Sequence, residues 1–171
     1  MFYFFSQVRV KKFFFAGLVL VLLAGFLGGC SIDPKAEENT TGLPDGLLGK
    51  WVSDYGDWYE ITGSGALKIS FDGTNVASEG IIRDVTNFNS SSGVIIVEYT
   101  SGAFINPARP FGAVYYLNFT GNTVSPNSAW DSTDPNGAEV PTLAEAIAKF
   151  TQASMGNYVN TALAVPYTRQ N

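Results

Sequence analysis

The chain contains no histidine and only one cysteine, Cys30, among its 171 residues. It therefore cannot form a Ser-His-Asp or Cys-His catalytic arrangement, a histidine-containing zinc site or an internal disulfide. Basic side chains are also scarce, with 10 Lys and Arg against 15 Asp and Glu. Because nucleic-acid binding depends on clustered Lys and Arg, we expect no nucleic-acid partner.

The first thirty residues have the features of an export signal. Three basic side chains between residues 9 and 12 precede an uncharged apolar stretch, residues 13–26, and Leu27-Gly28-Gly29-Cys30 follows. A positive segment, an apolar segment and small residues before a cleavage point are the parts of a secretory signal peptide. The last four residues resemble the bacterial lipobox, which implies cleavage before Cys30 and acylation of its sulfur and its new amino terminus.

The alternative interpretation of this segment is an uncleaved transmembrane helix. Residues 13–29 approach the roughly 17 to 25 apolar residues that a membrane-spanning helix needs. Glycines at positions 25, 28 and 29 weaken the end of such a helix. We therefore predict a lipoprotein signal peptide over residues 1–29, and a covalent lipid on Cys30 in place of any cofactor.

The remaining chain is predicted to be one acidic domain on a tether. All fifteen acidic residues and seven of the ten basic ones follow Cys30, which gives this part a formal charge of −8. Such a surface does not adhere to anionic lipid, so membrane attachment would depend on the acyl chains. Residues 30–46 are predicted to be the lipidated N-terminus and a flexible tether, and residues 47–171 the folded domain. Ser31 differs from the Asp that serves as an inner-membrane retention signal in lipoproteins of enteric bacteria, and the resemblance to such lipoproteins therefore implies the outer membrane, with the exposed face left open.

Short β-type runs separated by Gly, Asn, Asp and Ser fill most of this domain. Alternation is clearest in residues 113–119, where Tyr115, Leu117 and Phe119 would share one face. An eighth strand is expected within residues 156–160 and 164–168. The spacing is typical of an antiparallel sandwich or barrel. The first seven candidate strands are residues 48–55, 58–62, 66–71, 80–88, 94–100, 113–120 and 123–130.

One helix is predicted near the C-terminus, over residues 142–153. Thr142 followed by Glu145 is a capping box, and an Ala-rich run comes next. Residues 94–99 are apolar on both faces until Glu98, so the outer face of that strand requires a cover, which the helix would supply. The apolar face of the helix would consist of Leu143, Ala146, Ile147 and Phe150.

Gly49-Lys50-Trp51 on the first predicted strand resembles the opening motif of lipocalin-type barrels. In that family the tryptophan plugs one end of the barrel; the alternative is a core tryptophan of any β domain. A wider resemblance, to spirochaete lipoproteins of the Treponema type, implies a lipocalin-like barrel in a cell envelope but no known ligand or catalytic residue. It rests on GKWVS at 49–53, YEI at 59–61, RDVTNF at 83–88, GVIIVEY at 93–99, VYYL at 114–117 and TLAEAIAKF at 142–150.

Carboxylates are the remaining candidates for chemistry. Asp54, Asp57 and Glu60 could supply an acid–base pair or a calcium site, and residues 131–137 offer further oxygen ligands. The first group is interpreted as a polar turn between the first two strands, and residues 131–137, which lack a defined calcium-loop spacing, as a solvated loop. We therefore predict no catalytic residue and no metal site, and a protein that is not an enzyme.

Two arginines and two phenylalanines are the candidate binding residues. Arg83 or Arg109 could reach Glu98 across neighbouring strands, either in an ordinary ion pair or as a clamp for a ligand carboxylate inside the barrel. Phe104 and Phe111 flank a Pro-containing loop and would guard the barrel mouth, contact a partner or pack within the loop.

These features leave two hypotheses for the function. In the first, an aromatic-lined barrel interior binds a small hydrophobic or amphipathic ligand. In the second, a surface or structural lipoprotein contacts a host or envelope protein through its loops. Most aromatic side chains are expected in the core in either case.

Overall fold

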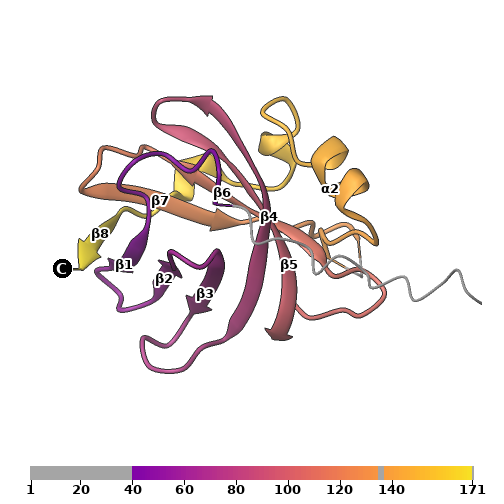
Figure 1. Cartoon of the computed structure of the whole chain (residues 1–171), viewed down its shortest axis with the longest axis horizontal. Coiled ribbons are helices and arrows are strands. Elements are labelled where there is room, and N and C mark those ends of the chain that lie inside the picture. Colours follow the sequence, from indigo (N-terminus) through magenta and orange to yellow (C-terminus); the bar gives the residue numbers. More distant parts are fainter. Residues whose placement is uncertain (1–39, 135–136, 171) are drawn as a thin grey trace, which may run out of the picture. The chain divides into compact units, whose positions relative to one another are not determined.

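Figure 1 shows the protein as a computed structural model that describes residues 40–134 and 137–170. Eight antiparallel strands form a closed barrel, in which each strand pairs with the next along the chain and the last pairs with the first. The predicted fold, mainly β with an eight-stranded barrel and one helix toward the C-terminus, is confirmed. The predicted signal peptide, Cys30 and the tether up to residue 39 lie outside the described residues.

The first seven strands coincide with the predicted runs, and β4 and β5 are the longest, as Figure 1 shows. The eighth strand overlaps only the second of the two segments expected to supply it. Residues 156–160 form no strand, because the amides of Tyr158 and Val159 both bond to the Met155 carbonyl at 3.0 Å and turn the chain. The strands are β1 (Gly49–Ser53), β2 (Trp58–Ile61), β3 (Ala66–Ser70), β4 (Ser78–Asn89), β5 (Ser92–Gly102), β6 (Phe111–Leu117), β7 (Thr123–Ser128) and β8 (Tyr167–Gln170).

Successive connections of this barrel alternate between its two ends. One end, which we call the base, carries the N-terminal segment 40–48 and the turns 62–65, 90–91 and 118–122. The opposite end, which we call the loop end, carries the connections 54–57, 71–77 and 103–110 and the start of the long connection 129–166.

The strands bury two apolar clusters, one on each side of the sheet. The inner cluster fills the barrel and includes Trp51, Ile82 and Val97. The outer cluster includes Val94 and Ile96 of β5, which lie under the helix and the segment after it. The predicted cover over this strand is therefore confirmed, and Figure 1 shows the helix on the outside of the barrel.

This helix, α2 (Leu143–Lys149), begins as predicted and ends earlier. Thr142 Oγ1 accepts from the Glu145 amide at 3.2 Å, and the Glu145 carboxylate accepts from the Thr142 amide at 3.1 Å. At the other end, Ser154 Oγ donates to the Lys149 carbonyl at 2.6 Å and accepts from the Thr151 amide at 2.9 Å. These bonds turn the chain out of the helix, so the predicted end at residue 153 is wrong.

The apolar face of α2 is narrower than predicted. Ala146 and Phe150 are buried in the outer cluster, and Leu143 packs against it. Ile147 is 44% exposed, so its predicted place on the buried face is wrong. A helix of two turns that lies on a curved sheet contacts it along one narrow stripe of side chains, here Leu143, Ala146 and Phe150. The two 3-10 helices η1 (Met155–Asn157) and η2 (Thr161–Leu163) follow α2 before the chain reaches β8.

Trp51 fills the base of the barrel. Its Nε1 donates to the Leu47 carbonyl at 2.9 Å, its ring meets Phe119 edge-on at 6.1 Å between centroids, and the guanidinium of Arg169 lies 5.8 Å from its centroid. Gly49 beside it has a φ of +117°, which favours glycine. The Gly49–Trp51 motif thus lies at one closed end of a barrel.

Phe119 belongs to this inner cluster, whereas Tyr115 and Leu117 belong to the outer one, so the predicted shared face of these three residues is wrong. Alternation stops at Asn118, whose φ of +54° ends β6 and turns the next side chain toward the base.

Replacing Trp51 with Phe removes the hydrogen bond to Leu47 and leaves unfilled volume in the base. We expect Trp51→Phe to lower the free energy of unfolding by about 2 kcal/mol, as measured by chemical denaturation. Trp130 is the matched control because its side chain is 61% exposed, and Trp130→Phe should change stability by less than about 0.5 kcal/mol. Equal losses for the two variants would contradict a special role for Trp51.

Candidate functional site: the loop end of the barrel

The interior of the barrel is filled by side chains. Between them lies a gap of about 10 Å³, lined by residues that include Leu47, Tyr59, Ile95 and Tyr116. A gap of this size holds at most one water molecule, whereas small-molecule sites measure roughly 300–1,000 Å³. The open, aromatic-lined interior expected for a ligand-binding barrel is not found within residues 40–134 and 137–170.

Tyrosines occupy the interior on the side of the loop end. The rings of Tyr59 and Tyr167 meet edge-on at 5.6 Å, and Tyr59 Oη lies 3.1 Å from Ser128 Oγ. Tyr167 Oη donates to the Asp57 carboxylate, which also accepts from Ser53 Oγ. Burial and the neighbouring Asp57 carboxylate raise the pKa of Tyr167, so its phenol remains a donor at neutral pH. Asp57 therefore fixes β1, β2 and β8 together.

Phe104 covers the mouth of the barrel from the connection 103–110. Its ring lies 5.2 Å from the ring of Tyr99 inside the barrel and 5.8 Å from the ring of Phe71 on the neighbouring connection. Phe111 lies elsewhere, at the start of β6, where its amide and carbonyl bond to Val140 and its ring packs in the outer cluster. Of the two predicted phenylalanines, only Phe104 covers the mouth of the barrel, because the ring of Phe111 packs on the outer face of the sheet.

Arg83 and Glu98 form the ion pair that was predicted from their positions on neighbouring strands. Arg83 Nε and Nη2 both lie 2.7 Å from Glu98 Oε2. Val97 next to Glu98 points into the barrel, so Glu98 lies on the outer face. The hypothesis of a carboxylate clamp inside the barrel is therefore wrong for this pair.

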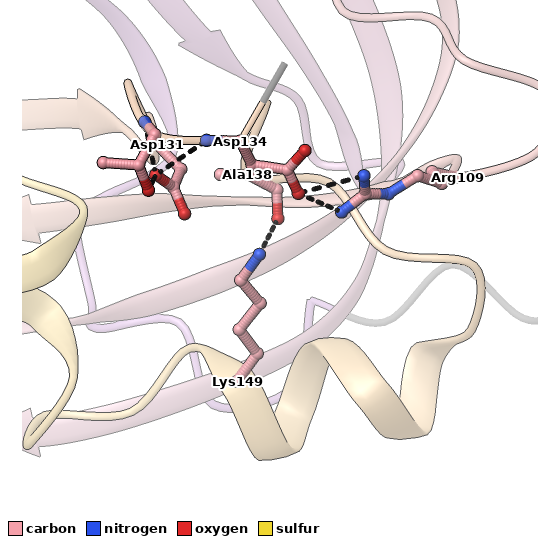
Figure 2. A network of polar contacts seen from close by, with 6 residues as sticks. Arg109, Asp131, Asp134, Ala138 and Lys149 are labelled. Carbon is pink, nitrogen blue, oxygen red and sulfur yellow. Dashed lines mark hydrogen bonds and ion pairs between the residues drawn. The ribbon is translucent and has the colours of Figure 1, made fainter. Parts of the chain in front are cut away.

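Arg109 bonds to Asp134 and not to Glu98. Figure 2 shows both guanidinium nitrogens of Arg109 directed at Asp134 Oδ2, each at 3.1 Å. In the same view, Lys149 Nζ donates to the Ala138 carbonyl at 2.6 Å. These contacts join the connection 103–110 and α2 to the start of the long connection, so Arg109 has a structural partner within the chain.

Glu139 lies beside this network and is only 9% exposed. Burial raises the pKa of Glu139, and the nearby charges of Arg109 and Lys149 oppose this shift less strongly. Gly137 leaves room for the carboxylate, since a Cβ at Gly137 would lie 2.4 Å from Glu139 Oε2. No pattern in the sequence indicates a buried carboxylate at this position.

Asp131 acts as a turn residue in the segment after β7. Asp131 Oδ1 accepts from the Thr133 amide at 2.9 Å and from its hydroxyl at 2.7 Å, and these bonds lower the pKa of Asp131. No group of three or more acidic or thiol side chains in the described part of the chain could hold a metal ion. Within the same residues, no helix has the length and apolar character needed to cross a membrane.

Large apolar side chains are exposed on the connections of the loop end. Neighbouring connections are held together there: the Ala103 amide donates to the Ala77 carbonyl at 2.8 Å, and a Cβ at Gly73 would lie 2.8 Å from the Gly56 carbonyl oxygen. Most aromatic side chains were predicted in the core, and Tyr55 and Phe71 are exceptions that lie on this surface. We call it the loop patch, and it consists of Tyr55, Phe71, Val76 and Ile105.

A second surface feature starts where β7 ends. Trp130, which the sequence placed at the end of the β7 run, is largely exposed. Its indole lines an open hollow of about 460 Å³ together with residues 156–161. We call this hollow the Trp130 groove. Its only sign in the sequence was a tryptophan followed at once by the polar loop 131–137.

The chain matches no protein-family model, no curated protein and no solved structure.

Glu139 makes stability depend on pH. Because its pKa is higher in the folded than in the unfolded chain, it favours folding below its unfolded pKa, and this contribution is lost as pH rises through its folded pKa. We expect Glu139→Gln to raise Tm relative to the wild type at pH 7, with the gain shrinking toward zero below about pH 4. Thermal unfolding followed at both pH values measures this, and a gain independent of pH would contradict the assignment.

Proposed function

We propose that the protein is a non-enzymatic, lipid-anchored lipoprotein of a bacterial cell envelope that contacts a partner through the loop end of its barrel. The distribution of exposed apolar side chains carries this proposal. Of the eight large apolar residues exposed in the described part, four form the loop patch and three lie on the connection 129–166. Leu48 alone lies at the base. Apolar surface gathered on connected loops is typical of an interaction site.

The positions of the N-terminal segment and the loop patch, at opposite ends of the barrel, support the same proposal. The described chain begins at the base, where Asn87 Nδ2 donates to the Gly42 carbonyl at 2.7 Å and Leu43 packs against the inner cluster. A tether from an acylated Cys30 would reach the domain at this end. The loop patch lies at the other end and would face away from the membrane.

The compartment is inferred from the sequence. The lipobox-like Leu27-Gly28-Gly29-Cys30 and the resemblance to spirochaete lipoproteins favour the cell envelope, and Ser31 favours its outer membrane. The excess of acidic residues in the domain leaves the acyl chains as the source of membrane attachment.

A small hydrophobic ligand held inside the barrel is the other candidate function. The closed barrel is compatible with it, but the interior gap of about 10 Å³ is not. A ligand would have to displace buried side chains such as Tyr59 or Tyr116, and close-packed interiors resist such changes. Contact through the loop end requires no rearrangement and is therefore the function that the geometry supports best.

The lipid anchor is tested by replacing the acylated residue. We expect Cys30→Ser to abolish incorporation of labelled palmitate and to move the protein from the membrane to the soluble fraction of the producing bacterium. The replacement is conservative and removes only the thiol that lipid attachment requires. Unchanged membrane association of Cys30→Ser would show that the segment 13–29 is retained as an anchor.

The loop patch is tested with the soluble domain, residues 40–171, and isolated cell envelopes. We expect the wild-type domain to sediment with the envelopes, and Tyr55→Ser combined with Ile105→Ser to weaken this binding at least about tenfold, because exposed apolar anchors dominate such contacts. Leu48→Ser removes an exposed apolar side chain at the base and is the matched control. Equal sedimentation of the three proteins, or none by the wild type, would contradict the proposal.

A further inference from the structure

The Trp130 groove has the size of a ligand site and lies outside the filled barrel. Its volume of about 460 Å³ falls within the roughly 300–1,000 Å³ of small-molecule sites. Trp130 forms one wall, and residues 156–161 form the other.

The backbone on both sides of the groove is fixed by hydrogen bonds. The Trp130 amide donates to the Tyr158 carbonyl at 3.1 Å, and the Ala129 amide donates to the Ala113 carbonyl of β6 at 2.8 Å. The Tyr158 ring packs edge-on against Phe150 at 5.3 Å, with Lys149 Nζ 5.2 Å from its centroid. The indole is therefore presented by an ordered frame, which lowers the entropy lost on binding.

The polar groups of the groove are uncharged. Asn160 Oδ1 accepts from the Ala162 amide at 3.2 Å, which orients the side chain and leaves its Nδ2 donors without a partner among the described residues. The Asn157 backbone amide donates to the Ser154 carbonyl at 2.9 Å, whereas the Asn157 side-chain amide, the Thr161 hydroxyl and Trp130 Nε1 make no hydrogen bond within this part of the chain. Burial and the Asp131 carboxylate raise the pKa of Tyr158, so it too is neutral at physiological pH.

We propose that the Trp130 groove binds a neutral saccharide. One pyranose ring stacks on the indole, and its hydroxyls bond to the side-chain amides of Asn157 and Asn160. The axial C–H groups of a β-linked pyranose carry partial positive charge and match the negative face of the indole. An amide offers both donors and an acceptor, as pairs of sugar hydroxyls require.

Other ligand classes fit these residues less well. A charged ligand would find no opposite charge among the lining residues, and a purely apolar one would leave the amide donors unpaired. A peptide would satisfy the amides, but neither wall of the groove is a strand with which it could pair. Saccharide binding in the groove goes beyond the proposed contact function, and it needs neither the lipid anchor nor the loop patch.

The test uses the full chain, purified in detergent, and four saccharide probes, of which three are neutral and one is charged. Tetrameric N-acetylglucosamine, cellotetraose, maltotetraose and heparin are titrated separately, followed by calorimetry and by tryptophan fluorescence. Fluorescence reports on the groove because Trp51 and Trp58 are buried and Trp130 is exposed. We expect saturable binding of at least one neutral tetrasaccharide and none of heparin.

The matched variants locate the binding. Trp130→Ala should weaken it at least about tenfold, because it removes the stacking surface, and Asn157→Ala should weaken it several-fold. Leu48→Ala removes an exposed apolar side chain at the base of the barrel, outside the groove and outside the loop patch, and should leave affinity unchanged.

Absence of saturable binding by every saccharide, or binding that survives Trp130→Ala, would overturn the proposal. Saturable binding of a peptide library through Trp130, with no saccharide bound, would overturn it as well and assign the groove to a peptide. Membrane anchoring and envelope binding through the loop patch are measured in separate experiments. A failure of either can therefore be told apart from a failure of saccharide binding in the groove.

Discussion

The closure of the barrel by β8 is the constraint on which the rest of the structure depends. Four residues, Tyr167–Gln170, pair with β1 along their whole length and with the start of β7. Without them, β1 and β7 would be open edges of a curled sheet, with unpaired backbone groups exposed. The side chain of Tyr167 also holds β8 in place, because its ring packs against Tyr59 and its hydroxyl donates to Asp57.

The long connection that precedes β8 has a role beyond joining two strands. Residues 129–166 leave the loop end, cover the outer face of β5 and β6 with α2, and return along η1 and η2. The same segment forms both walls of the Trp130 groove and supplies Asp134 to Arg109. One insertion between the last two strands thus provides the second core, the ion pair and the candidate ligand site.

Local patterns predicted most of the fold. Alternation located seven strands, and the capping box of Thr142 and Glu145 located the start of α2, because both depend on residues close in sequence. The end of α2 was missed, since it depends on the hydroxyl of Ser154 competing for the helix carbonyls. The inward turn of Phe119 was missed for a similar reason, because a single positive φ at Asn118 breaks the alternation.

The candidate site was less predictable because it depends on contacts between distant segments. The pairing of Arg83 with Glu98 follows from neighbouring strands, but that of Arg109 with Asp134 requires the path of the long connection. Alternation shows which residues face inward and not whether they fill the space they enclose, so the closed interior could not be predicted. Exposure of Trp130 likewise follows from the point at which β7 stops pairing, after Ser128.

The opposite placement of the N-terminal segment and the loop end has a mechanical consequence. A pull between residue 40 at the base and a partner held at the loop end runs along the strands and not across them. Such a load shears the ladders of β1 with β2 and with β8, so their hydrogen bonds resist together and cannot open one at a time. The barrel is thus oriented to bear tension in the direction in which a tethered contact would apply it.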